Sequence, residues 1–133
     1  MIGIVIVAHG GLAEEYRRAV EHVMGPQAGL RAISVGASCD RASKEREICA
    51  AADAVDAGDG VVVVTDMFGG SPSNLSLNAC APRDRVIFYG ANLPSLIKLA
   101  RSRAKPVSEA VALAKAAGTR YMDVAQGPVV TTS

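Results

Sequence analysis

The sequence predicts a doubly wound α/β domain, an open and mostly parallel sheet with helices on both faces. Two observations carry this expectation. Apolar runs of strand length alternate four times with segments of helical periodicity. The runs Ile4–Val7 and Val61–Thr65 are almost entirely aliphatic, which is typical of strands buried on both faces of a parallel sheet. We expect the strand order 2-1-3-4, in which the first and third strands are neighbours.

The first half of the chain supplies two of the strands and two helices. After the strand at Ile4–Val7, apolar residues at helical spacing predict a helix over Leu12–Met24, which Gly25-Pro26 ends. A short strand is expected at Leu30–Val35. A helix rich in alanine and charge follows over about Arg41–Ala57.

The second half continues the alternation. Its expected elements are a strand at Val61–Thr65, a helix from Ser71 to about Cys80, a strand at Val86–Tyr89, and helices at Ser95–Ser102 and Val107–Ala117. Gly118 is expected to end the last helix, and Tyr121–Val124 is a candidate for a fifth, antiparallel strand at an edge. We expect one domain over residues 1–125 and a mobile tail over residues 126–133.

Composition excludes several classes of function. With 14 basic and 13 acidic residues the net charge is +1, which favours neither nucleic acid nor an anionic membrane. The N-terminal apolar run is short, lacks a preceding basic region and is broken by His9, so we expect a cytoplasmic protein without a signal peptide. The three cysteines show no metal-ligand spacing, so we expect reduced thiols, no metal and no cofactor. The basic cluster Arg101, Arg103 and Lys105 is expected on a solvated face.

The candidate reactive residue is His9, at the end of the first strand. An imidazole is a useful nucleophile near neutral pH because much of it is unprotonated there. Asp66 follows the third strand in the same way, and the order 2-1-3-4 places the two side by side. A carboxylate on one ring nitrogen leaves the lone pair of the other pointing outward and stabilises the cation formed during transfer.

The segment after Asp66 supplies a candidate anion site. Ser71-Pro72 reads as a helix N-cap followed by proline at the first helical position. The free N–H groups of that helix, with the hydroxyls of Ser71 and Ser73, would then lie beside His9. These parts suit phosphoryl transfer. Because the chain has no Walker A lysine motif and no metal cluster, we expect another protein, rather than a bound nucleotide, to donate the phosphoryl group.

Three segments together resemble a known family. IVIVAHGGLAEE, VVVVTDMFGGSPSN and GANLPSL, in this order and spacing, are similar to the enzyme IIA domains of the mannose-type bacterial phosphoenolpyruvate-dependent sugar phosphotransferase system (PTS). The resemblance spans nearly the whole chain. It implies that His9 takes a phosphoryl group from phospho-HPr and passes it to a separate IIB component for sugar uptake, with Asp66 as its partner.

The resemblance also implies the surroundings of the site. Gly69, Gly70, Ser71 and Pro72 would shape the phosphate-facing loop, with Gly70 among the anion-binding residues. It further implies a homodimer in which the last strand crosses to the other subunit, and membrane contact only through the PTS permease. From the residues themselves, Gly10 allows the turn after the first strand. Asn92 either lines the site or holds the turn before the next helix.

Other functions stay open at this point. The chain could be a stand-alone regulatory module, in which phosphorylation of His9 controls the binding of a partner. It could be the component that phosphorylates a dihydroxyacetone kinase subunit, although there the motif after the aspartate usually lacks the FGGSP pattern. A small tetrapyrrole metal chelatase also begins with a strand and a His-Gly step, but its site needs further metal-binding or proton-handling groups near His9.

Overall fold

The structure, a computed structural model, describes residues 1–67, 71–81 and 84–128, apart from the side chain of Ser73. In these residues four parallel strands form one sheet in the order β2-β1-β3-β4. They are β1 (Gly3–His9), β2 (Leu30–Val35), β3 (Val61–Thr65) and β4 (Arg85–Phe88). The predicted α/β fold and strand order are thus confirmed.

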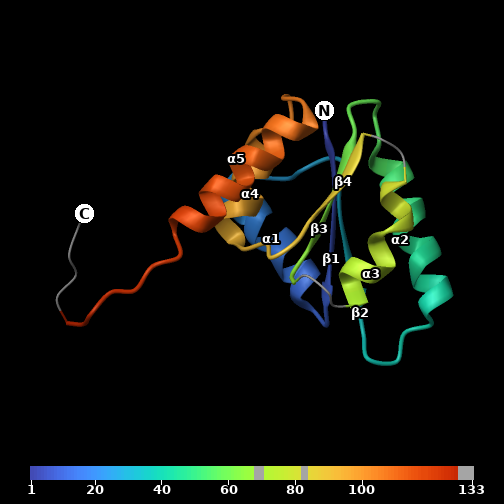
Figure 1. Cartoon of the computed structure of the whole chain (residues 1–133), viewed down its shortest axis with the longest axis horizontal. Coiled ribbons are helices and arrows are strands. Elements are labelled where there is room, and N and C mark those ends of the chain that lie inside the picture. Colours follow the sequence, from blue (N-terminus) through green and yellow to red (C-terminus); the bar gives the residue numbers. More distant parts are fainter. Residues whose placement is uncertain (68–70, 82–83, 129–133) are drawn as a thin grey trace.

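Helices cover both faces of the sheet (Figure 1). One face carries α1 (Leu12–Met24), α4 (Leu93–Arg101) and α5 (Val107–Arg120). The other face carries α2 (Arg41–Val55), α3 (Ser71–Ser76) and the short 3-10 helix η1 (Asn78–Cys80). The helix predicted up to about Cys80 is therefore two shorter pieces.

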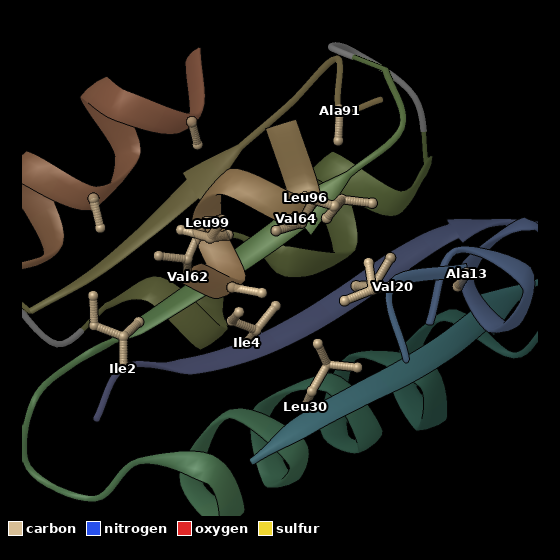
Figure 2. Packing of buried hydrophobic residues seen from close by; sticks show 14 of the residues in the cluster. Ile2, Ile4, Ala13, Val20, Leu30, Val62, Val64, Ala91, Leu96 and Leu99 are labelled. Carbon is tan, nitrogen blue, oxygen red and sulfur yellow. The ribbon is translucent and has the colours of Figure 1, made fainter. Parts of the chain in front are cut away.

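Alternating residues of β1 and β3 build two separate cores. Ile4, Ile6, Val62 and Val64 pack with α1, α4 and α5 (Figure 2). The residues between them, Val5, Val7, Val61 and Val63, pack with α2 and with Leu75 and Ala79 beyond β3. Because all eight side chains are at most 1% exposed, the central strands are buried on both faces, as their aliphatic composition predicts.

Gly3 lies where β1 meets the end of α2. A Cβ at this position would lie 2.4 Å from the carbonyl oxygen and 2.6 Å from Cγ2 of Val55, so strand and helix would have to separate. We expect Gly3→Ala to lower the free energy of unfolding by about 1–3 kcal/mol, as overpacking does. Urea denaturation measures this. The matched control is Gly36→Ala, where a Cβ meets nothing within 4 Å; an equal loss in both variants would contradict the packing explanation.

The prediction that Gly118 ends the last helix is wrong, because α5 continues through it to Arg120. Gly118 is instead a point of close approach between helices. A Cβ there would lie 3.0 Å from Cβ of Ser95 and 3.1 Å from Oδ1 of Asn92, and the Gly118 carbonyl accepts a hydrogen bond from Nδ2 of Asn92 at 2.9 Å. The glycine is needed for packing and not for a turn.

The fifth strand proposed for Tyr121–Val124 does not form in the described chain. These residues follow the longer α5 without pairing, and Figure 1 shows the segment leading away from the sheet. The side chains of Tyr121, Met122 and Val124 are 67%, 80% and 89% exposed. The outer edge of β4 is therefore unpaired among the described residues.

Arg103 was predicted on a solvated face, and this prediction is wrong. The residue is 3% exposed and lies at the amino end of the sheet. Its guanidinium donates to the carbonyl oxygens of Ile2 (2.7 Å) and Gly29 (3.0 Å) and to the side chain of Gln27 (3.3 Å). Burial lowers its pKa from the ordinary value. These carbonyls precede β1 and β2, and the Gly29 carbonyl also accepts the Ile4 N–H of β1, so the arginine joins the amino ends of the two strands.

The cysteines agree with the prediction of reduced thiols. Cys39, Cys49 and Cys80 are free and pack against the core on the α2 side of the sheet. Burial raises the pKa of the Cys80 thiol to about 11, which keeps it protonated at neutral pH.

Candidate functional site

The candidate site lies where the strand order reverses. β2 pairs with one side of β1 and β3 with the other, with Val7 opposite Thr65 in the β1–β3 register. His9 is the last residue of β1, and Asp66 is the first residue after β3. In doubly wound sheets, this point at the carboxyl ends of the strands is where ligands bind.

His9 and Asp66 are joined by two interactions with one carboxylate oxygen. Asp66 Oδ2 lies 2.8 Å from Nδ1 of His9 and accepts the backbone N–H of His9 at 3.0 Å. A carboxylate carries no hydrogen to donate, so Nδ1 carries the proton, and in the neutral imidazole Nε2 therefore keeps its lone pair. The His9 side chain is 48% exposed, whereas that of Asp66 is 11% exposed. The structure thus confirms the expected adjacency, with the imidazole accessible and the carboxylate beneath it.

The pKa of Asp66 lies below its ordinary value. Burial is the largest single influence and raises the pKa. The backbone and side-chain hydrogen bonds from His9, the attraction of the imidazole and the interaction with the Asp66 backbone N–H together outweigh it. Asp66 is therefore ionised at neutral pH. Its other oxygen, Oδ1, is buried and has no hydrogen-bond partner among the described residues.

Hydrogen bonds join the turn after His9 to the end of β2. Gly10 has φ +55°, a conformation that side chains other than glycine rarely adopt. Its N–H donates to the Val35 carbonyl at 3.1 Å, and its carbonyl accepts the hydroxyl of Ser34. Gly10 thus forms the turn that the sequence predicts. Ser34 was not predicted, because a serine near a strand end has no distinctive signal.

The predicted anion cradle lies only partly within the described residues. α3 begins at Ser71, which is half-buried, and Pro72 is buried. Gly69, Gly70 and the side chain of Ser73 lie outside the described part of the chain, so their predicted contacts with phosphate stay predictions. After His9, α1 begins with Gly11 at its N-cap position and no side-chain cap, which leaves its first N–H groups available to water or an anion.

Asn92 is engaged in holding two helices. Its Oδ1 accepts the Ser95 N–H at 3.1 Å, and Oγ of Ser95 accepts the Asn92 N–H at 3.0 Å. These two hydrogen bonds form a capping box at the start of α4. Its Nδ2 donates to Gly118 of α5. Of the two roles considered from the sequence, the structure shows the one that holds the turn.

Tyr16 approaches the site from α1, which the sequence did not indicate. Its hydroxyl lies 3.4 Å from the Ala91 carbonyl oxygen, and the Ala91 N–H donates to the Thr65 carbonyl, next to Asp66. Burial and the negative charge of Asp66 both raise the pKa of Tyr16. Tyr16 occupies one of the helically spaced positions from which the sequence predicts α1. Only its hydroxyl distinguishes it from the apolar residues on the same face of this helix.

The fold and this His–Asp pair define a class of protein, the small doubly wound α/β domains that carry an accessible histidine, oriented by a carboxylate, at the switch point of the sheet. Sequence comparison gives the family. The family described as "PTS system fructose IIA component" matches residues 3–115. The chain belongs to this family, within the fructose and mannose branch of the PTS enzyme IIA components.

Several solved structures share the fold of this chain. The mannose/sorbose-specific IIA subunit from Enterococcus faecalis is 23% identical with a TM-score of 0.84, and the match covers 98% of each chain. The PTS IIA protein associated with the fucose utilization operon of Streptococcus pneumoniae is 27% identical, with a TM-score of 0.75 over 86% of this chain and 88% of that one. EIIA from Streptococcus agalactiae is 23% identical, with a TM-score of 0.78 over 93% and 97%.

Among curated proteins, none matches the sequence. Within residues 1–67, 71–81 and 84–128, no helix combines the length and apolar character that crossing a membrane requires.

Proposed function

We propose that this chain is a phosphoryl carrier of the PTS, which accepts a phosphoryl group from phospho-HPr on His9 and passes it to a separate IIB component. The observation that carries the proposal is the 2.8 Å contact between Nδ1 of His9 and Oδ2 of Asp66. It fixes the proton on Nδ1 and leaves Nε2 as the nucleophilic nitrogen on an accessible ring.

The transfer follows from this arrangement. The Nε2 lone pair attacks phosphorus, the bond from phosphorus to the donor atom breaks, and the donor keeps that electron pair. The imidazole ring gains positive charge as the new N–P bond forms. The Asp66 carboxylate, held ionised by its hydrogen bonds with His9, stabilises that charge. Transfer to the acceptor runs in the opposite direction, with the electron pair of the N–P bond returning to Nε2.

The transferred phosphoryl group also needs hydrogen-bond donors. We assign this role to the start of α3, with Gly70, Ser71 and Ser73 as donors and with Gly69 and Pro72 shaping the loop. Ser71 supports this assignment, because it is half-buried and is the first residue of α3, a helix that packs beside β1. The free N–H groups of α1 add positive potential on the other side of His9.

The proposal includes a homodimer. In the described chain the edge of β4 is unpaired, and the apolar side chains of Tyr121, Met122 and Val124 are exposed on a segment that leads away from its own sheet. Pairing of this segment with a second copy would cover both features.

Phosphotransfer to defined acceptors tests the proposal. The chain is labelled with phosphoenolpyruvate, enzyme I and HPr, and is then offered a purified mannose-type IIB component or a dihydroxyacetone kinase subunit in parallel. We expect one acid-labile phosphoryl group per chain and its loss to IIB alone. Transfer to the kinase subunit alone would assign the alternative role. A stable label that neither acceptor removes would favour the regulatory module.

A further inference from the structure

The carboxylate of Asp66 is only half satisfied. Oδ2 receives both hydrogen bonds from His9, while Oδ1 is buried without a partner among the described residues. A buried carboxylate oxygen that lacks a donor is costly, because this oxygen has lost its contact with water and has no hydrogen bond in its place. Asp66 nevertheless has to stay ionised to stabilise the charge on His9. A second donor close to Oδ1 would resolve this conflict.

Tyr16 is the described residue placed to supply that donor. Its hydroxyl lies 3.4 Å from the Ala91 carbonyl oxygen, and the Ala91 N–H donates to the carbonyl of Thr65, the residue before Asp66. The negative charge of Asp66 also contributes to the raised pKa of Tyr16. Its own hydrogen bond, to the Ala91 carbonyl at 3.4 Å, is longer than an ordinary O–H···O bond and therefore weak. The phenolic proton is thus available to a stronger acceptor. His9 lowers the pKa of Asp66, and the charge of Asp66 raises that of Tyr16.

We propose that the Tyr16 hydroxyl is the second hydrogen-bond donor of Asp66, serving Oδ1 while His9 serves Oδ2, and that Tyr16 is therefore a positioning residue for His9. No direct hydrogen bond joins Tyr16 and Asp66 in the structure, so one bridging water or a small tilt of the ring makes the connection. The role of Tyr16 in transfer rests on the proposed function, whereas its effect on Asp66 does not.

The ring of Tyr16 has a separate, structural task. It packs against the core between α1, α4 and the sheet. Tyr16→Phe keeps this packing and removes only the hydroxyl. Tyr121→Phe is the control, since it removes the same atom from a tyrosine that follows α5, and the strand pairing proposed for the homodimer uses the backbone of this residue and not its hydroxyl.

Two measurements on Tyr16→Phe test the proposal. The first follows the Asp66 carboxyl by NMR during a pH titration of the unphosphorylated protein. The pKa of Asp66 is expected to be higher in Tyr16→Phe than in the wild type, and unchanged in Tyr121→Phe. The second is the rate of phosphorylation by phospho-HPr, which we expect to fall about three- to tenfold in Tyr16→Phe, the effect of one hydrogen bond.

The outcomes separate this proposal from the proposed function. An unchanged Asp66 titration in Tyr16→Phe overturns the proposal, whatever happens to the rate, because a slower rate alone would then reflect packing. A raised pKa with a normal rate confines Tyr16 to a structural hydrogen bond and overturns its positioning role. If the wild type accepts no phosphoryl group, the proposed function fails while the titration still decides whether Tyr16 serves Asp66.

Discussion

His9→Ala is expected to abolish phosphorylation of the chain completely. The imidazole is the proposed nucleophile, and no other side chain of the described site has a lone pair oriented by a carboxylate in this way. Because the side chain is about half exposed, its removal should leave the fold intact. The measurement is incorporation of label from phosphoenolpyruvate through enzyme I and HPr, with circular dichroism to check folding.

The matched control for this variant is His22→Ala. His22 is the second histidine of the chain and lies exposed in the last turn of α1, far along the helix from the site. We expect it to accept the phosphoryl group as the wild type does. Labelling that persists in His9→Ala, or that disappears in His22→Ala, would place the phosphoryl group elsewhere.

Asp66→Asn has the second largest expected effect, at least about tenfold slower phosphorylation with the fold retained. An amide carries no charge to stabilise the imidazolium, and its NH₂ group can reverse the proton arrangement on the ring. Rapid-quench rates with phospho-HPr measure the effect. Asp84→Asn is the control, since Asp84 is an exposed carboxylate before β4. Equal rates in the wild type and Asp66→Asn would remove Asp66 from the mechanism.

The effect of Asp66→Asn on the free energy of unfolding is expected to depend on pH. The pKa of Asp66 is lower in the folded chain than its ordinary value. The resulting stabilisation is therefore present above the unfolded pKa, about 3.9, and is lost as the pH falls through the folded pKa. The difference in unfolding free energy between wild type and Asp66→Asn should shrink as the pH falls below about 4. A difference that grows in acid would contradict the lowered pKa.

The sequence predicted the fold well because its strongest signals are local. The aliphatic runs at β1 and β3 are typical of a parallel sheet covered on both faces. Gly25-Pro26 after a periodic segment marked the end of α1 at Met24, where the structure also ends it. The adjacency of His9 and Asp66 then followed from strand order alone.

The errors concern residues whose role depends on distant parts of the chain. A glycine that ends a helix and a glycine that lets two helices touch look alike in sequence, so Gly118 was misassigned. Arg103 sits among other basic residues in the sequence, and only the folded chain brings the carbonyls of Ile2 and Gly29 to it. Tyr16 could not be distinguished from its apolar neighbours on α1, because only the folded chain brings Asp66 and Ala91 near it.

The most direct test of the account is to identify the phosphorylated atom. NMR of the phosphorylated chain distinguishes a phosphoryl group on Nε2 of a histidine from one on Nδ1. The contact between Nδ1 of His9 and Asp66 predicts a single phosphohistidine, at His9 and on Nε2. A phosphoryl group on Nδ1 of His9, or on any other residue, would contradict the account.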